Sequence, residues 1–335
     1  MSTATETGEA GNHSGCNSSC DKDPTYSVPI CSPASSPSTP ASARVPSLAF
    51  GLYKIPDSDE GVGIMADAIL EAGYRHLDSA SIYGNERSLG RALALALATT
   101  AAPSNGSKRI ERSRLFVASK VWNDAQRGGR DAVRKSVLQS LRDLGLDYLD
   151  LCYVHWPVPG HFVETYRELM DLRREGKILH LGISNFRIED YEELEAAILP
   201  PEEFVPPLVH QLEVSPFLYR PETLRYFKEK GVLLAASKAL HRAATLDDPV
   251  VEAVAESHSH HRGGAGVTPP QVLLRWGLQK GLVVLAKTSR LSRMVENRDL
   301  LDFELSLAEV ERLDALTTPG AIETREALEA QRREG

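Results

Sequence analysis

Four side chains of types that can transfer protons, Asp78, Tyr83, Lys120 and His155, lie at or just beyond the ends of short apolar runs. A phenol titrates near ~10, which is too high for an efficient proton donor at neutral pH unless a neighbour lowers its pKa. Lys120 beside Tyr83 would stabilise the phenolate, and Asp78 would keep Lys120 charged and oriented. His155 would hydrogen-bond the oxygen atom that receives the proton. These residue types predict acid catalysis at an oxygen atom.

Each of the four also has an ordinary structural explanation. A buried Asp–Lys pair is often structural, and a tyrosine after a strand often only packs against its neighbours. A single histidine at a strand end is more often a hydrogen-bonded core residue than a catalyst. The case for a shared site therefore depends on whether the fold brings the four side chains together.

Eight β-rich runs alternate with helix-patterned segments from residue 46 onward. Apolar residues recur at helical spacing between the runs, as at Val133, Val137 and Leu141. The run 148–155 is apolar at nearly every position, which is typical of parallel strands that are covered on both faces. The predicted strands are residues 47–55, 74–79, 115–121, 148–155, 178–184, 208–214, 232–236 and 282–286.

Eight βα units in this length predict an α/β fold of the closed (β/α)8 barrel (TIM barrel) type, whose usual size is ~250 residues. A doubly wound open sheet is the competing architecture, and the strand count fits it less well. A barrel carries its working residues in the loops after the carboxyl ends of the strands. Asp78 with Tyr83, Lys120 and His155 follow or end three consecutive predicted strands, so they should converge on one face.

Gly61, Gly63 and Ala66 match the glycine fingerprint of dinucleotide-binding folds by their letters alone. In that fold the glycines follow a strand directly, so that its end delivers a pyrophosphate to the helix N-terminus. Here residues 56–60, with three carboxylates, intervene and would repel a pyrophosphate. We interpret the segment as an ordinary helix start and expect no Rossmann domain.

Five motifs of the chain resemble the aldo-keto reductase superfamily in order and spacing, over about residues 46–316. They are residues 77–86 (LDSASIYGNE), 117–122 (VASKVW), 153–157 (YVHWP), 181–186 (LGISNF) and 286–288 (AKT), the last followed by Arg293 and Asn297. The resemblance implies NADPH-dependent reduction of aldehydes or ketones by hydride transfer on a barrel. It also implies a catalytic tetrad of Asp78, Tyr83, Lys120 and His155, with Tyr83 as the general acid.

By the same resemblance, Ser184, Asn185 and Gln211 would hydrogen-bond the nicotinamide carboxamide of the cofactor. Polar residues at such positions also cap helices or satisfy strand ends. The family usually stacks a tyrosine on the nicotinamide ring where this chain has Ser237. Two further departures, Leu52 for a usual threonine and Ser215 for a frequent histidine, do not involve the tetrad.

The resemblance also implies an adenosine end of the cofactor site. Lys287, Thr288 and Arg293 would hold the 2′-phosphate, with Glu296 and Asn297 near the adenine. Two cations and a hydroxyl suit phosphate recognition, since arginine supplies a bidentate fork. A solvated basic loop is the plain alternative. The match favours NADP over NAD.

The substrate pocket is predicted from aromatic residues at strand ends. Tyr53, Trp122 and Trp156, together with His155, would line an apolar entrance that accepts aldehydes and ketones broadly. Aromatic residues at strand ends are also ordinary packing. The segment after residue 316 carries no aromatic residue, and since this tail helps to select substrates in relatives, a permissive pocket is expected.

The chain divides into three predicted parts. Residues 1–43, with ten Ser, five Pro and few large apolar residues, are expected to be a disordered leader. Residues 44–318 should form the barrel, and residues 319–335 a polar C-terminal tail. Residues 246–266 are expected to be a long loop, in which His258, His260 and His261 are solvated, and no metal is predicted.

The 335-residue chain has a formal net charge of −8 and no apolar run as long as a bilayer-spanning helix. We therefore expect small-molecule partners and neither a nucleic-acid nor a membrane surface. The four cysteines do not form a disulfide-scaffold pattern, and the leader has neither a signal-peptide core nor a basic transit pattern. A monomer in the cytoplasm is expected.

A function of a different class stays open at this stage. The barrel could serve as a regulatory subunit that binds NADPH and reports redox state to a partner, with slow or vestigial chemistry. The long leader with Cys16 and Cys20 is consistent with that reading. The presence of all four tetrad residue types favours the enzyme.

Overall fold

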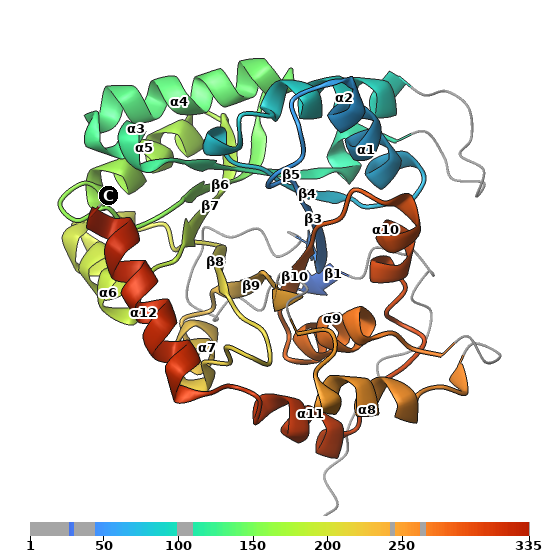
Figure 1. The fold of residues 1–335 in the computed structure, drawn as a ribbon. Coiled ribbons are helices and arrows are strands. Elements are labelled where there is room, and N and C mark those ends of the chain that lie inside the picture. The colour runs from blue at the N-terminus through green and yellow to red at the C-terminus, as the bar shows by residue number, and fades with distance from the viewer. Residues whose placement is uncertain (1–26, 30–43, 99–109, 242–244, 262–265, 335) are drawn as a thin grey trace, which may run out of the picture.

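The computed structural model describes residues 27–29, 44–98, 110–241, 245–261 and 266–334 (Figure 1). Eight parallel strands close into a barrel in the order β10-β3-β4-β5-β6-β7-β8-β9, which confirms the predicted (β/α)8 architecture. The strands are β3 Leu48–Gly51, β4 His76–Asp78, β5 Phe116–Val121, β6 Leu149–Val154, β7 Ile178–Ser184, β8 Val209–Glu213, β9 Leu233–Ser237 and β10 Val283–Ala286. Each lies within a predicted run, apart from the last residue of β9.

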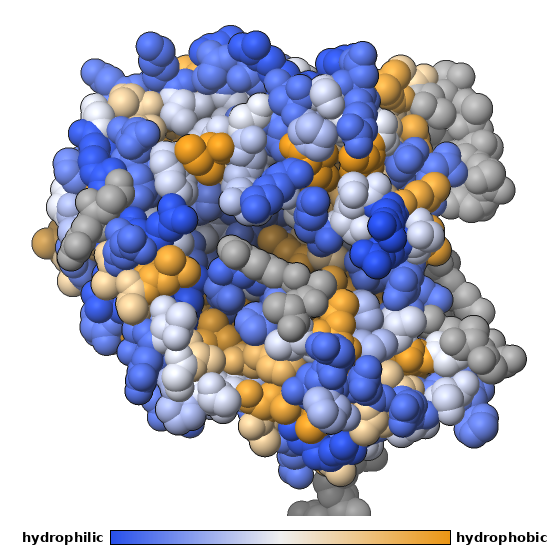
Figure 2. Space-filling model, in the orientation of Figure 1, coloured by the Kyte–Doolittle hydropathy of each residue, from blue (hydrophilic) through white to orange (hydrophobic). Residues whose placement is uncertain are grey.

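Helices surround the barrel (Figure 1). Apolar side chains between the helices and the strands form the larger core, and a smaller core that includes Tyr153 and Val209 is separate from it. Figure 2 shows that the rim of one face is mostly hydrophilic, with apolar residues nearer its middle. The helices are α1 Asp59–Leu70, α2 Glu86–Ala98, α3 Asn123–Arg127, α4 Gly129–Leu144, α5 Phe162–Arg174, α6 Ile188–Ala197, α7 Pro221–Glu229, α8 Pro249–Ser257, α9 Pro269–Gln279, α10 Leu291–Arg298, α11 Leu307–Asp314 and α12 Pro319–Glu334.

The glycine pattern near residue 61 belongs to the start of α1, as predicted. Ser58 caps this helix, and its hydroxyl accepts a hydrogen bond from the Gly61 amide at 3.3 Å. A Cβ atom on Gly61 would lie 1.9 Å from the carbonyl oxygen of Pro56. Gly61 therefore permits close packing of the helix on the preceding loop rather than a phosphate contact.

The expectation that residues 246–266 form a long loop is wrong. The segment 246–266 contains helix α8, because Asp248 caps it by accepting hydrogen bonds from the amides of Val250 and Val251, and Pro249 occupies its first turn. In the leader, β1 (Ser27–Pro29) pairs antiparallel with β2 (Arg44–Pro46). The remainder of the leader lies outside the described residues.

In the ranges that the structure describes, no helix combines the length and the apolar character needed to cross a membrane.

Candidate active site

The barrel brings the four tetrad residues to the carboxyl end of neighbouring strands. Asp78 ends β4, Lys120 lies near the end of β5, and His155 follows β6. Tyr83 lies on a short 3₁₀ turn, Ser81–Tyr83, whose Ser81 hydroxyl donates to the Lys120 carbonyl at 3.0 Å. The turn after β4 is thereby tied to β5, which sets Tyr83 beside Lys120.

Lys120 is the centre of the site. Its Nζ donates to Asp78 Oδ1 at 2.6 Å and to the Ser79 carbonyl at 2.7 Å. The second carboxylate oxygen of Asp78 accepts from Gln211 Nε2 at 2.7 Å. Burial is the largest single effect and would lower the pKa of Lys120, but the charges and hydrogen bonds of Asp78 and Tyr83 together outweigh it and hold this pKa above its usual value. The ammonium is therefore charged and fixed in direction.

The interior of the barrel beneath Lys120 is filled by Tyr153. The Lys120 Nζ atom lies 5.6 Å from the centre of the Tyr153 ring, within cation–π range. A Cβ atom at Gly182 would lie 2.5 Å from this ring, so the glycine on β7 makes room for it. Lys120 therefore lies against an aromatic residue of the smaller core.

Tyr83 lies next to this ammonium, with 3.5 Å between Lys120 Nζ and the phenolic oxygen. Burial raises the pKa of Tyr83 above its usual value, and the charge of Lys120 opposes that rise. Lys120 lowers the pKa of Tyr83, which is the direction that the sequence predicts, but the loss of solvation is larger and makes the net shift upward. The phenol is protonated at neutral pH.

His155 completes the group. Its ring centre lies 6.0 Å from that of Tyr83 and 4.9 Å from that of Trp122, edge to face in both cases. Burial, and then the charge of Lys120, lower the pKa of His155 well below its usual value, so the ring is neutral. Its Nδ1 atom has no hydrogen-bond partner among the described residues.

The predicted substrate-lining aromatics surround the tetrad. The ring of Tyr53 lies 5.2 Å from that of Tyr83 and is about half exposed, with a relative accessibility of 53%. Trp122 contacts His155, and Trp156 is buried beside it in the chain. Ile82, which the sequence reading did not single out, is also exposed next to Tyr83. The exposed side chains of Tyr53 and Ile82 therefore give the protein an apolar surface beside Tyr83.

The four residues predicted for the nicotinamide end lie at or near the carboxyl ends of β7, β8 and β9. Asn185 has a left-handed backbone, with φ of 59°, and its Nδ2 atom donates to the His155 carbonyl and to Ser184 Oγ, both at 2.9 Å. Gln211 holds Asp78, as described above. Ser237 ends β9 opposite Glu213, so no aromatic ring stands at this position.

The residues predicted for the adenosine end lie on one connection. Lys287 and Thr288 follow β10, and Arg293 lies on the first turn of α10, with both cationic side chains exposed. Glu296 instead accepts a hydrogen bond from Thr268 at 2.6 Å, and Asn297 is buried. These last two side chains are engaged with the fold.

A buried carboxylate, Glu86, contacts β5 through Ser119. The sequence did not predict this residue as part of the site. Glu86, at the start of α2, accepts hydrogen bonds from Ser119 at 2.6 Å and Ser140 at 2.7 Å. Burial raises the pKa of Glu86 above its usual value. Since Ser119 precedes Lys120, this contact helps to fix the strand that carries the lysine.

A second cluster that the sequence reading missed stands next to Asn185. Glu213 pairs with Lys238 and, at 2.8 Å, with Arg325 of α12. Glu213 is the last residue of β8, a position that the sequence pattern indicates. No local signal in the sequence connects Arg325 to it. The C-terminal helix therefore contributes to the site.

The histidines of the segment before α9 do not form a metal centre in the described part of the chain. His258 faces Glu309, with 3.2 Å between Nε2 and Oε1, and stacks on His261. The expectation that His258 is solvated is therefore wrong, because the residue packs against α11.

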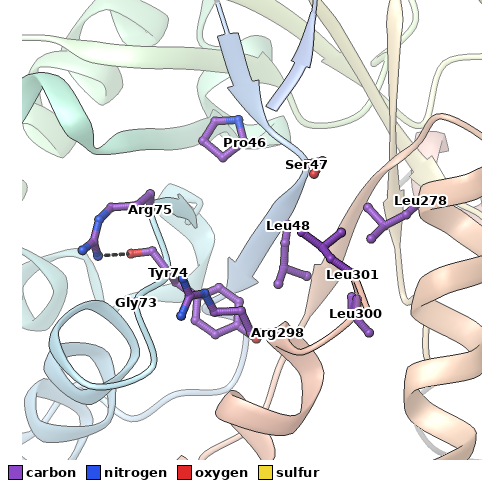
Figure 3. Close-up of a pocket in the computed structure, with 10 residues that line it drawn as sticks. All are labelled: Pro46, Ser47, Leu48, Gly73, Tyr74, Arg75, Leu278, Arg298, Leu300 and Leu301. Carbon is purple, nitrogen blue, oxygen red and sulfur yellow. Dashed lines mark hydrogen bonds between the residues drawn. The ribbon is translucent and has the colours of Figure 1, made fainter. Parts of the chain in front are cut away.

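A pocket at the opposite end of the barrel is separate from the tetrad (Figure 3). It is lined where β3 and β4 begin and where α9 and α10 end, by residues that include Leu48, Tyr74, Leu278 and Arg298. Tyr74 points its hydroxyl at the Met294 carbonyl, 3.2 Å away. This pocket carries none of the tetrad residues.

The fold and the site together define a (β/α)8-barrel oxidoreductase with an Asp, Tyr, Lys and His group at the carboxyl end of its strands. The family model described as the aldo/keto reductase family matches residues 47–318. The chain belongs to this family.

Relatives of several kinds agree with this assignment. An uncharacterized oxidoreductase, YtbE, of Bacillus subtilis (strain 168) is 34% identical over 82% of this chain and 89% of its own length. A glyoxal reductase of the same organism is 35% identical, again over 82% and 89%. These relatives support an oxidoreductase that acts on small-molecule carbonyl compounds.

Solved structures show the same fold. An aldo/keto reductase from Brucella melitensis has a TM-score of 0.70 at 33% identity, covering 82% of this chain and 96% of that one. A Bombyx mori aldo-keto reductase in complex with NADP has a TM-score of 0.69 at 28% identity, covering 82% and 90%. The barrel is therefore shared over almost the whole length of these proteins.

Proposed function

We propose that the protein is an NADPH-dependent reductase that converts aldehydes or ketones to alcohols, with Tyr83 as the proton donor. The observation that carries the proposal is the contact of one buried ammonium, Lys120, with both Asp78 and Tyr83 beside His155. The relatives named for glyoxal reduction and for an NADP complex support the same kind of substrate and cofactor.

The side chains present fit a phosphorylated nicotinamide dinucleotide. Ser184 and Asn185 offer polar groups beside His155, where a carboxamide would be held. Lys287 and Arg293 are exposed on the same connection as the Thr288 hydroxyl, and two cations with a hydroxyl form a donor set for a phosphate. When bound, this cofactor supplies a hydride to the carbonyl carbon.

A side chain of the protein, Tyr83, supplies the proton. The phenol of Tyr83 is protonated at neutral pH and gives its proton to the alkoxide oxygen that forms at the reacting carbon, because an alkoxide is a much stronger base than a phenolate even when burial raises the pKa of the phenol. The ammonium of Lys120 then stabilises the phenolate, at a distance of 3.5 Å in this structure. Asp78 and the Ser79 carbonyl keep that ammonium in place.

His155 orients the substrate. A neutral imidazole can donate a hydrogen bond to a carbonyl oxygen without offering a competing charge to Lys120. The edge contact with Trp122 fixes the plane of the ring. Tyr53 and Trp122 provide an apolar wall, which suits small aldehydes and ketones of several shapes.

The test is the loss of NADPH absorbance with a panel of aldehydes and ketones. Tyr83→Phe should lose more than about 90% of kcat, a barrier increase above ~1.4 kcal/mol, while binding NADPH as wild type does. Tyr53→Phe is the matched control, because it removes a neighbouring phenol that Lys120 does not contact. Full activity in Tyr83→Phe would refute the role of the tyrosine. Tight NADPH binding with no turnover of any carbonyl would favour a regulatory subunit.

A further inference from the structure

Helix α12 is held against the barrel by charged side chains on one of its faces. It lies near α6 and α7 (Figure 1). Arg333 pairs with Asp190 of α6, and Glu329 pairs with Arg220, the residue before α7, at 2.8 Å. With Arg325, these helix residues are spaced four apart, so they share a face.

Arg325 of this face reaches the nicotinamide end of the proposed cofactor site. The residue has a relative accessibility of only 6%. Its guanidinium donates to Asn185 Oδ1 and Glu213 Oε2, both at 2.8 Å, and to Glu329 Oε1 at 2.7 Å. The guanidinium carbon also lies 5.5 Å from the centre of the Trp156 ring. The buried guanidinium of Arg325 thus connects α12 to the segments that carry Asn185 and Glu213.

This contact fixes the direction of the Asn185 amide. The Nδ2 atom donates to the His155 carbonyl and to Ser184 Oγ, while the oxygen accepts from Arg325. Arginine only donates, so the amide atom that faces it must be the oxygen. A flipped amide would point its own hydrogens at the guanidinium and would lose the His155 contact. Without Arg325 the amide keeps one fixed end and loses the other.

We propose that Arg325 is a positioning residue that orients the Asn185 amide for the nicotinamide carboxamide, and that docking of α12 is thereby coupled to cofactor affinity. This inference rests on the proposed function. Coupling is reciprocal, so bound NADPH should in turn favour the docked tail.

A lysine cannot replace this arginine. The planar guanidinium reaches three acceptors at once, whereas an ammonium on a flexible stem acts as a point charge. Arg325→Lys would keep the attraction to Glu213 and Glu329 but would not fix the orientation of the Asn185 amide. The conservative variant therefore separates positioning from simple charge.

The experiment measures the dissociation constant of NADPH by quenching of intrinsic tryptophan fluorescence. Arg325→Met and Arg325→Lys should each weaken binding about tenfold, because a charge-assisted hydrogen bond to the binding residue is lost. Arg333→Met is the matched control: it removes a buried arginine of the same helix face that contacts Asp190 and not Asn185. It should weaken binding clearly less than Arg325→Met does, because it loosens the docking of α12 without removing the contact with Asn185.

A double-mutant cycle tests whether Arg325 acts through the asparagine. In an Asn185→Ala background, Arg325→Met should have almost no further effect on NADPH binding.

Tryptic cleavage of the tail gives a readout that is independent of turnover. NADPH should slow this cleavage in wild type and should not slow it in Arg325→Met.

The outcomes distinguish this inference from the proposed function. Equal weakening by Arg325→Met and Arg333→Met, or additive effects with Asn185→Ala, would refute positioning while leaving the reductase assignment intact. If wild type binds no NADPH, both fail together.

Discussion

The pair of Lys120 and Asp78 gives the sharpest prediction for stability. The exposed fractions of the two side chains are 0% and 3%, so water does not screen either charge. Lys120→Met keeps a chain of similar length and removes the ammonium. Asp78 then retains the hydrogen bond from Gln211 but loses the cation at 2.6 Å.

The expected cost follows from that burial. Removing one partner of a buried ion pair leaves an uncompensated charge and destabilises a protein by about 3–5 kcal/mol. Removing both charges with Asp78→Asn in the same chain should recover most of this loss, since the amide can still hydrogen-bond. The double variant should therefore unfold within about 1–2 kcal/mol of wild type.

Urea unfolding followed by circular dichroism measures these differences, compared at constant denaturant slope. Lys280→Met is a control with the same residue types, because Lys280 and Asp314 are also 2.6 Å apart but are 18% and 24% exposed. It should cost about 1 kcal/mol. An equal loss for Lys120→Met and Lys280→Met would refute the argument from burial. Both tetrad variants should lack reductase activity, so stability and chemistry are measured separately.

Three further predictions concern the cofactor and pH. Replacing Lys287 and Arg293 together by Ala should weaken NADPH at least tenfold more than NADH, because only NADPH carries the 2′-phosphate; an equal loss in titrations with both would contradict this. Since an acid must be protonated to act and burial raises the pKa of Tyr83, kcat/KM should be retained at neutral pH and should fall only at a pH above the ordinary range of a phenol. The pH profile of kcat/KM should show no change near the usual pKa of a histidine, since burial lowers the pKa of His155 well below it. A change near pH 6.5 would contradict the neutral state of His155. Ser237→Tyr should tighten NADP+ several-fold if the residue faces the ring, as fluorescence titration would show.

Much of the fold and the tetrad could be predicted because their signals are local. An apolar run followed by Asp78, Lys120 or His155 marks both a strand and its carboxyl end. The barrel then fixes which ends are neighbours, as the register of Lys120 opposite Tyr153 shows. Sequence patterns therefore predict the positions of residues near strand ends better than those of other site residues.

Other features depend on three-dimensional distances that no local pattern encodes. Asp248 and Pro249 did carry the start signal of α8, but the surrounding Gly and His residues obscured it. The pKa direction of Tyr83 depends on depth of burial, which exceeds the effect of its lysine neighbour. Arg325 meets Asn185 across 140 positions, and its charge alone is typical of an exposed helix.

These contacts arrange the site in two layers with different physical tasks. The inner layer, Lys120 with Asp78 and Gln211, is buried on strands, so we expect a change there to alter both folding and the proposed proton transfer. The outer layer joins Arg325 to Asn185 through a terminal helix held by ion pairs. A helix end can undock at a smaller cost than a barrel strand, because fewer buried contacts must be broken. If the proposals for Arg325 and Tyr83 hold, variation in the tail would tune cofactor affinity while the acid role of Tyr83 stays unchanged.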